Sequence, residues 1–437
     1  MMHCLQSAGA TSRLLLFGIL GCLPAGTALG QAQPVFPTLP GPADSPAYLA
    51  TQITARMRDN LQRLPDYTCT ETIERTRQTL DGKILMEDTL HLEVGLIDNE
   101  EMFAWPGSDE FQGGLHNLVT SGSFGSGAYG IYAKEVFLNE DRPTLRPQGR
   151  VNLDDLDGGK ELLKYGFTIP WNRNEFVMRV GKFSATPSFQ GSIYVDPENL
   201  DLRRMNVILT DIPSELDIAI ATDQVNYDRV KVGQERFLLP VSNVLTMANH
   251  RDEVRNYVRF ENCHKFEGES TISFGDPALL EDAEQEATPN EVVQEITIPS
   301  GAGLHIVIDT KIVLDETAVG DLVAGEVIDN VRVDGEDLIP KGAKVTGRVI
   351  RMDRWQQRYV LAIQLIDISW KGGHASVDGY LESLPDPRIQ YPGNRGMRLA
   401  TVDGDNPLPG RRKPQVILIP RPAPKSIQNI VTYWRTY

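Results

Sequence analysis

The sequence has few of the side chains that most often bind metals or crosslink small folds: its 437 residues include 4 cysteines and 7 histidines. These counts exclude a cysteine-rich zinc scaffold and a disulfide-dense miniprotein. The histidines are dispersed, and no His-Glu-x-x-His pair occurs among His91, His116, His250, His264 and His305. A zinc hydrolase would therefore lack its ligands, and we expect neither a metal nor a cofactor.

Acidic residues outnumber basic residues in this sequence. The chain has 43 Lys and Arg against 59 Asp and Glu, a net charge of −16, which argues against nucleic acid as a partner. Residues 387–437 are the exception, with nine Lys and Arg, two Asp and eight prolines. We interpret this basic tail as wrapping over the acidic parts of its own chain. The alternative is contact with an anionic envelope polymer or a lipid head group.

Long apolar runs are missing after residue 30, where none approaches the ~20 residues of a membrane-spanning helix. Before that point, Arg13 is the one charged residue and precedes the apolar run 14–20. Ala28 and Gly30 occupy the −3 and −1 positions of a signal-peptidase site. Residues 1–30 thus predict a signal peptide and an exported protein, periplasmic or associated with the outer membrane.

Two processing routes fit this segment. Cleavage after Gly30 would start the mature chain at or near Gln31. Alternatively, Ile19-Leu20-Gly21-Cys22 loosely matches a lipobox, in which Cys22 would be lipidated. Both routes place the mature protein outside the cytoplasm.

A helix is expected after the Pro-rich lead-in 31–44. Ser45-Pro46 supplies an N-cap and an N1 proline, and Pro65 ends the periodic pattern. Apolar residues recur between them at helical spacing: Leu49, Ile53, Met57, Leu61 and Leu64. The opposite face is polar and mostly basic, with Arg56, Arg58, Asp59 and Arg63.

From Tyr67 to about residue 275 the period changes to two. Tyr67, Cys69, Glu71 and Ile73 alternate with polar residues, and Asp81-Gly82 is a hairpin turn. Turn signals recur every 8–15 residues between the further strands Phe176–Val180, Gly191–Val195, Met205–Leu209, Gln224–Val230, Phe237–Met247, Val254–Phe260 and Glu269–Phe274. We predict a large antiparallel, half-barrel-like sheet in domain 45–275, with two short helices from Gln112–Phe137 covering it.

The predicted boundary of this domain is the acidic linker 276–292, which has no basic residue. Residues 293–386 return to period two and predict a small all-β barrel or sandwich module. In the tail 387–437, Gln415–Ile419 and Ile430–Trp434 are candidates for added strands. The fold class is therefore mainly β, with one N-terminal helix.

No motif completes a catalytic or binding site. His374, Ser376 and Asp378 would point to one face of a strand ~6.5–7 Å apart, too far for triad hydrogen bonds of ~2.6–3.2 Å, so we expect a solvated strand. Residues 152–159 resemble part of a calcium-binding loop. With Gly158 at position 6 of an EF-hand loop, however, Leu153 and Lys164 fall at positions 1 and 12, where carboxylates are needed, so we expect a hairpin turn.

The remaining candidates are weaker. Ser121–Gly127 is Gly-rich but lacks the Lys-Ser/Thr of a P-loop, so we expect a flexible loop. For Trp105-Pro106-Gly107 and Trp171 we expect core or rim packing; the alternative is contact with a glycan or lipid. We therefore assign no catalytic residue and predict that the protein is not an enzyme.

Cys69 and Cys263 are the two cysteines that remain after signal removal. An even number of cysteines in an exported chain favours a disulfide. Cys69 lies on the first expected strand and Cys263 near the last one of the domain, so a closed or half-closed meander would bring them together. The alternative is two buried free thiols.

Three stretches resemble a family of uncharacterised secreted bacterial envelope proteins: Leu64–Arg75, Phe103–Gly107 and Ser270–Gly275. A helix followed by a long antiparallel meander is also similar to the half-barrel of periplasmic lipoprotein carriers. That resemblance implies a concave apolar face that holds acyl chains.

Residues 296–350 resemble the TrbI-like β-domain of type IV secretion components. The matching segments include Ile298–Gly301, Ala318–Asp321, Leu338–Ala343 and Gly347–Val349. The chain lacks the inner-membrane helix of such channel proteins. Neither family supplies a catalytic constellation.

Together these observations predict an exported, non-enzymatic envelope protein that binds an apolar or lipid ligand, an envelope polymer or a protein partner. One alternative is a secreted hydrolase whose site is assembled only by the fold. Another is a structural subunit of an envelope assembly.

Overall fold

A computed structural model describes residues 45–108, 110–119, 121–125, 127–180, 183–266, 294–355, 358–384, 397–400, 415–420 and 423–437. Within these ranges the chain is mainly β, with two α-helices, four short 3-10 helices and 26 strands. The predicted fold class is confirmed.

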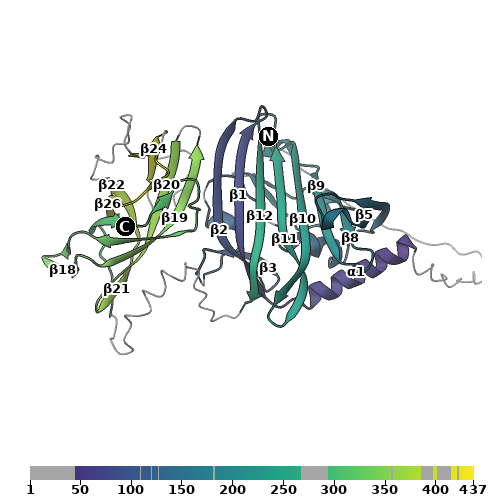
Figure 1. The fold of residues 1–437 in the computed structure, drawn as a ribbon, viewed down its shortest axis with the longest axis horizontal. Helices are drawn as coiled ribbons and strands as arrows, with labels where there is room; N and C mark the ends of the chain where they lie inside the picture. The colour runs from purple at the N-terminus through teal and green to yellow at the C-terminus, as the bar shows by residue number, and fades with distance from the viewer. Residues whose placement is uncertain are drawn as a thin grey trace, which may run out of the picture. The chain divides into compact units, whose positions relative to one another are not determined.

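We call residues 45–266 the first segment, and ten of its strands form one antiparallel meander (Figure 1). Across the sheet the order is β3 (Glu100–Ala104), β2 (Ile84–Ile97), β1 (Tyr67–Thr79), β12 (Asp252–Lys265), β11 (Glu235–Ala248), β10 (Ile220–Val232), β9 (Leu202–Thr210), β8 (Ser188–Val195), β5 (Glu161–Ile169) and β4 (Arg146–Asn152). The first and last strands of this segment along the chain, β1 and β12, are therefore neighbours in the sheet.

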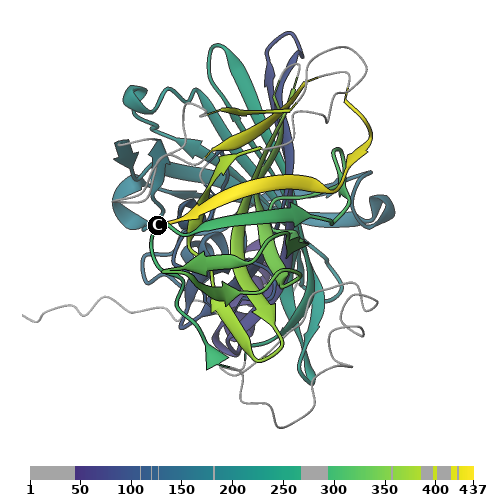
Figure 2. The same cartoon turned by 90° about the vertical axis from the view of Figure 1, so that its left-hand side faces the viewer.

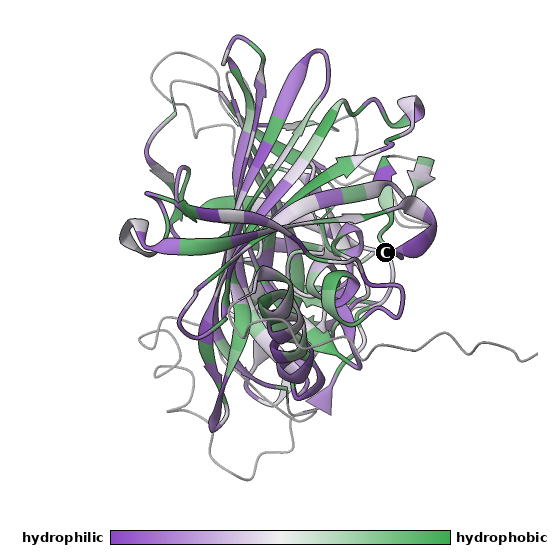
Figure 3. Cartoon of the chain, turned by 90° about the vertical axis from the view of Figure 1, so that its right-hand side faces the viewer, coloured by the Kyte–Doolittle hydropathy of each residue, from purple (hydrophilic) through white to green (hydrophobic). Residues whose placement is uncertain are grey.

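Along many strands hydrophobic and hydrophilic residues alternate (Figure 3), as expected where one face is buried. On β1, positions 67, 69, 71, 73 and 75 are buried. We call the face to which they belong the inner face, because α1 and α2 lie against it.

Helix α1 (Pro46–Gln62) begins where the sequence predicts, since Ser45 Oγ accepts a hydrogen bond from Tyr48 N at 3.3 Å. Ile53 and Met57 of its apolar stripe are fully buried. Near its C-terminus, Asn60 donates to Leu238 O at 3.0 Å and accepts from Leu238 N at 2.9 Å. This pair of bonds clamps the end of α1 to β11.

The segment between β3 and β4 covers the inner face. It contains η1 (Leu115–Asn117) and α2 (Ile131–Phe137), where the sequence predicts two short helices. Tyr132, Val136 and Phe137 of α2 are buried against the sheet. Neither α-helix in the described part of the chain is long and apolar enough to cross a bilayer.

Smaller elements complete this segment. They are η2 (Asp157–Gly159), η3 (Trp171–Arg173), η4 (Ser214–Leu216) and a hairpin of β6 (Met178–Val180) with β7 (Phe183–Ala185). Sequence alternation did not single out β4, β5 and β7. The strand predicted at Phe176–Val180 begins later, at Met178, because Phe176 N donates a hydrogen bond to Asn174 Oδ1 in a turn.

The second segment, the described residues from 294 to 437, contains only strands and connecting turns (Figure 2). Its main ladder has the order β22 (Gly379–Ser383), β26 (Ile430–Thr436), β14 (Gly303–Ile308), β16 (Leu322–Val327), β19 (Lys344–Trp355) and β20 (Arg358–Trp370). β20 also pairs with β21 (Gly373–Ser376) and β24 (Val416–Pro420). The two candidate strands of the tail thus form and join this ladder.

The short strands of this segment are β13 (Gln294–Glu295), β15 (Ile312–Val313), β17 (Val331–Val333), β18 (Glu336–Ile339), β23 (Arg398–Ala400) and β25 (Ser426–Ile427). Asp334 and Gly335 both have positive φ, 54° and 89°, and form the tight turn between β17 and β18.

β19 continues the first sheet, because Asp353–Trp355 pair with 86–88 of β2, leaving 93–97 of β2 to β3. Asp353 and Asp88 lie directly opposite each other at this junction, and both carboxylates are buried. Arg75 binds Asp88 at 2.8 and 2.5 Å, and Arg351 binds Asp353 at 2.5 Å. Each buried carboxylate therefore has a guanidinium partner.

Several predictions concern residues outside those described: the signal peptide 1–30 with Cys22, the lead-in 31–44, the expected strand Glu269–Phe274 and the linker 276–292. The domain limits stay a prediction.

The predicted disulfide is confirmed. Cys69 of β1 and Cys263 of β12 are joined with Sγ–Sγ 1.98 Å and Cα–Cα 4.1 Å. They meet because β12 returns to pair with β1, with a register shift between Thr68 and Thr70. The bond crosslinks residues 194 positions apart.

We predict that the double variant Cys69→Ser/Cys263→Ser lowers the free energy of unfolding by up to ~5 kcal/mol, the loop-closure entropy of a ring of this length. Guanidinium unfolding of the exported protein measures this change, and reducing the wild type should reproduce it. Equal unfolding midpoints for the wild type, oxidised and reduced, would contradict the prediction.

Candidate functional site

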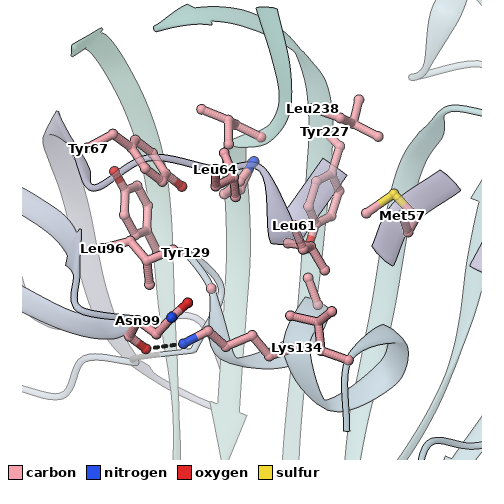
Figure 4. A pocket seen from close by; sticks show the side chains of 15 residues that line it. Met57, Leu61, Leu64, Tyr67, Leu96, Asn99, Tyr129, Lys134, Tyr227 and Leu238 are labelled. Atoms are coloured by element: carbon pink, nitrogen blue, oxygen red, sulfur yellow. Dashed lines mark hydrogen bonds between the residues drawn. The ribbon is translucent and has the colours of Figure 1, made fainter. Parts of the chain in front are cut away.

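A small cavity lies between α1, α2 and the inner face (Figure 4). Most of its wall is apolar and comes from the end of α1 and from three other parts of the chain: Met57, Leu61, Leu64, Leu96, Ala133, Leu138, Leu238, Leu239 and Pro240. Its volume is about 10 Å³, enough for a single water molecule.

Polar groups lie at two places in this cavity wall. Lys134 Nζ of α2 donates to Asn99 O beside the cavity. On the opposite side, the phenol of Tyr227 is buried, and its hydroxyl has no hydrogen-bond partner in the described part of the chain. An unpaired buried hydroxyl costs free energy, so this position suits a water or a polar ligand atom.

Three acidic side chains lie among apolar residues near this cavity. Burial raises the pKa of Glu71 well above its usual value, and the nearby Glu101 raises it further. Burial also raises the pKa of Glu101 to about 7, against the opposing hydrogen bond from Gly127 N at 3.2 Å. These carboxyls hold their protons more tightly than ordinary glutamates.

Asp223 of β10 is the third acid. Burial raises its pKa to about 7, although Asn243 Nδ2 donates to Oδ1 at 2.8 Å and Tyr132 of α2 also donates to the carboxyl. Glu101 and Asp223 interact electrostatically, as do Glu71 and Glu101. The acids on β1, β3 and β10 therefore form one coupled group.

Four tyrosines surround these acids. The rings of Tyr67 and Tyr129 stack with centroids 5.2 Å apart, and Tyr129 OH donates to Cys69 Sγ at 3.2 Å. Burial raises the pKa of Tyr67, Tyr129, Tyr132 and Tyr227. The phenols stay protonated, so the four tyrosines contribute neutral hydrogen-bonding groups to an apolar wall.

The Gly-Ser segment, predicted to be flexible, is bound to the inner face. Arg75 Nη1 donates to Ser121 O at 2.8 Å, and Asn256 Nδ2 donates to Ser123 O at 3.1 Å. Glu101 accepts from Gly127 N. Buried polar groups of three strands thus hold its backbone.

The candidate triad does not assemble. His374 Nδ1 lies 3.5 Å from Asp367 Oδ1, on the neighbouring strand β20, and makes no hydrogen bond to Ser376 in the described part of the chain. At the loop 152–159, Asp155 pairs with Arg204 at 3.0 Å. No group of three potential metal ligands occurs among the described residues.

Three of the five dispersed histidines have a hydrogen-bonding side chain nearby. His91 and His305 pair with Asp321 and Asp329 at 2.7 and 2.9 Å, and His264 Nε2 lies 2.9 Å from Thr68 Oγ1. Trp105 packs at the core with the Arg348 guanidinium 5.8 Å from its ring, whereas Trp171 is 60% exposed.

Sequence reasoning missed Glu101, Asp223 and Tyr227. A signal existed for two of them, since Ala221, Asp223, Val225 and Tyr227 alternate as Tyr67, Cys69, Glu71 and Ile73 do. An acid within the apolar half of such an alternation is predicted to be buried. Nothing local marks Glu101.

The raised pKa values predict a pH-dependent stability. Asp223 has an ordinary value of 3.8 and a folded value of about 7, so the unfolded chain releases this proton first as pH rises. Stability is therefore lost between about pH 4 and pH 7, by at most ~1.4 kcal/mol per pH unit for each such group. Asp223→Asn should flatten this decline and stabilise the protein above pH 7.

Urea unfolding at pH 5, 6, 7 and 8 measures this dependence. Asp211→Asn, at an exposed turn, is the matched control and should follow the wild type. If Asp223→Asn and the wild type have the same slope, the carboxyl titrates normally in the folded protein.

Comparison with known proteins adds little. No protein-family model and no curated protein matches the sequence. Among solved structures, the chain is similar to a DUF1329 family protein from Desulfovibrio piger ATCC 29098, with 14% identity and a TM-score of 0.29. The match covers 54% of this chain and 99% of that one. A likeness this weak gives no basis for transferring a function.

Proposed function

We propose that this chain is an exported, non-enzymatic protein of the cell envelope whose first sheet binds an apolar or lipid ligand. The observation that carries the proposal is the leucine-lined cavity between α1 and α2 on the inner face. The predicted signal peptide and the resemblance to periplasmic lipoprotein carriers support it. The TrbI-like resemblance of residues 296–350 supports a protein partner for the second segment.

The cavity is closed around a space for one water, so an acyl chain enters only if α1 and α2 separate. Leu61 and Leu64 at the end of α1 are half-buried, and both lie in the cavity wall. Removing leucine side chains from water is favourable, by ~25 cal/mol per Å² of apolar surface. A ligand chain between the helices would replace contacts that these leucines now make with other residues around the cavity.

The raised pKa values of these acids fit an apolar ligand. Ionised carboxylates beside an acyl chain would have to be desolvated at high cost, whereas neutral carboxyls and phenols carry no such penalty. The unpartnered Tyr227 hydroxyl gives the ligand one hydrogen-bonding position inside the cavity. The site therefore favours a chain with a polar atom along it over a pure hydrocarbon.

We predict that Leu61→Glu/Leu64→Glu weakens binding of a fluorescent fatty-acid analogue at least tenfold, because two carboxylates would face the apolar chain. Fluorescence titration measures the Kd. Leu80→Glu is the control, because Leu80 is 65% exposed at the β1–β2 turn and does not line the cavity.

Unfolding curves of both variants separate lost binding from lost folding. The proposal fails if the double variant folds and binds like the wild type, or if the wild type does not bind the analogue. Mass spectrometry of lipids extracted from protein purified from its native envelope provides an independent check, and an empty extract counts against ligand carriage.

A hydrolase is the second candidate. Glu101 and Asp223 favour it, because two coupled carboxyls with pKa about 7 can exchange protons near neutral pH. Hydrolysis in a panel of chromogenic esters, glycosides and phosphoesters that Asp223→Asn abolishes would establish this candidate. Ligand binding without hydrolysis would leave the carrier proposal in place.

A further inference from the structure

A second cavity of about 160 Å³ lies on the polar side of α1. Three arginines line it: Arg56 from α1, Arg63 at the C-cap of α1, and Arg229 from β10. The rest of its wall is Met57, Asp59, Asn60, Asp201 and Leu238. Since one water needs ~10–15 Å³ of such space, this volume accommodates a tetrahedral oxyanion.

Asp201 organises two of these arginines. Arg229 donates from Nε and Nη2 to the two carboxylate oxygens at 2.7 Å each, and Arg56 donates from Nε at 2.9 Å. Asp201 itself is 4% exposed. Burial acts to raise its pKa, but the bonds from Arg229 and Arg56 outweigh this effect and lower it. The carboxylate is therefore ionised and fixes both guanidinium groups.

Donors remain after these bonds are made. A guanidinium has five N–H groups, and Arg56 uses only Nε, so its two terminal NH₂ groups have no hydrogen-bond partner in the described part of the chain. Arg63 pairs with Asp59 at 3.2 Å and approaches Glu235 at 3.9 Å, both exposed pairs that a stronger acceptor can displace.

The local charge favours an anion. Three guanidinium groups face two carboxylates in the cavity wall, although the whole chain carries −16. α1 and its C-cap residue contribute Arg56, Arg58 and Arg63 against Asp59 alone. These arginines belong to the face that the sequence predicts to lie opposite the apolar stripe of the helix.

The two cavities share part of their walls. Met57 and Leu238 line both of them, and the Asn60–Leu238 clamp holds α1 beside the second. A molecule with a charged head and an apolar chain would therefore meet arginines and leucines around the same turn of α1.

We propose that the arginine cavity binds the phosphate-bearing head group of the amphiphile whose acyl chain occupies the leucine-lined cavity. This inference rests on the proposed function and narrows its ligand to anionic lipids. Guanidinium and phosphate form paired, charge-assisted hydrogen bonds, which makes arginine well suited to this head group.

Calorimetric titration of the full chain tests the inference with three probes: dodecyl phosphate, uncharged dodecanol and inorganic phosphate. We expect dodecyl phosphate to bind at least tenfold more tightly than dodecanol. Arg56→Gln/Arg63→Gln should remove this difference. Arg58→Gln, on the same helix but outside the cavity wall, should preserve it.

Each other result is decisive. If dodecanol and dodecyl phosphate bind equally to the wild type, the inference is wrong and the proposed function stands. If inorganic phosphate binds as tightly as dodecyl phosphate, the site takes free phosphate and not a lipid head group. If neither alkyl probe binds, the proposed function and the inference both fail, whether or not inorganic phosphate binds.

Discussion

The inner face of the first sheet buries carboxyl groups and an arginine among leucines and aromatic rings, and the segment that covers this face has to satisfy them. Arg75 and Asp88 are fully buried and pair with each other, and Arg75 also needs Ser121 O. Removing one member of a buried ion pair typically costs ~3–5 kcal/mol, because the remaining charge has no partner. The covering segment is therefore fixed by polar contacts as well as by packing.

This constraint explains the glycines of that segment. A Cβ on Gly122, whose φ is +74°, would lie 2.8 Å from Arg75 Nη1, and one on Gly125 would lie 2.5 Å from Leu245 Cδ2. Glycine is needed there for close approach of the backbone to the sheet. The same approach places α2 against α1 and closes the cavity between them, so the architecture of the cover determines the size of the proposed site.

The sequence predicts the fold better than the site for a physical reason. Capping by Ser45, the apolar stripe through Met57 and the alternation along β1 are local, and each is present in the structure. The site depends on register between distant strands: Arg56 meets Asp201 across 145 positions, and Asp223 meets Asn243 and Tyr132 only after β10, β11 and α2 have assembled. The disulfide was predictable because an exported chain with two cysteines at opposite ends of a meander has few alternatives.

The proposed ligand is an anionic amphiphile that lies along the end of α1 with its chain between α1 and α2. A crystal structure of the protein with dodecyl phosphate tests it most directly. We predict the alkyl chain between Leu61 and Leu96, with α1 and α2 further apart, and phosphate oxygens ~2.7–2.9 Å from the Arg56 guanidinium. Dodecyl phosphate bound elsewhere, with the cavity between α1 and α2 still closed, would contradict the claim.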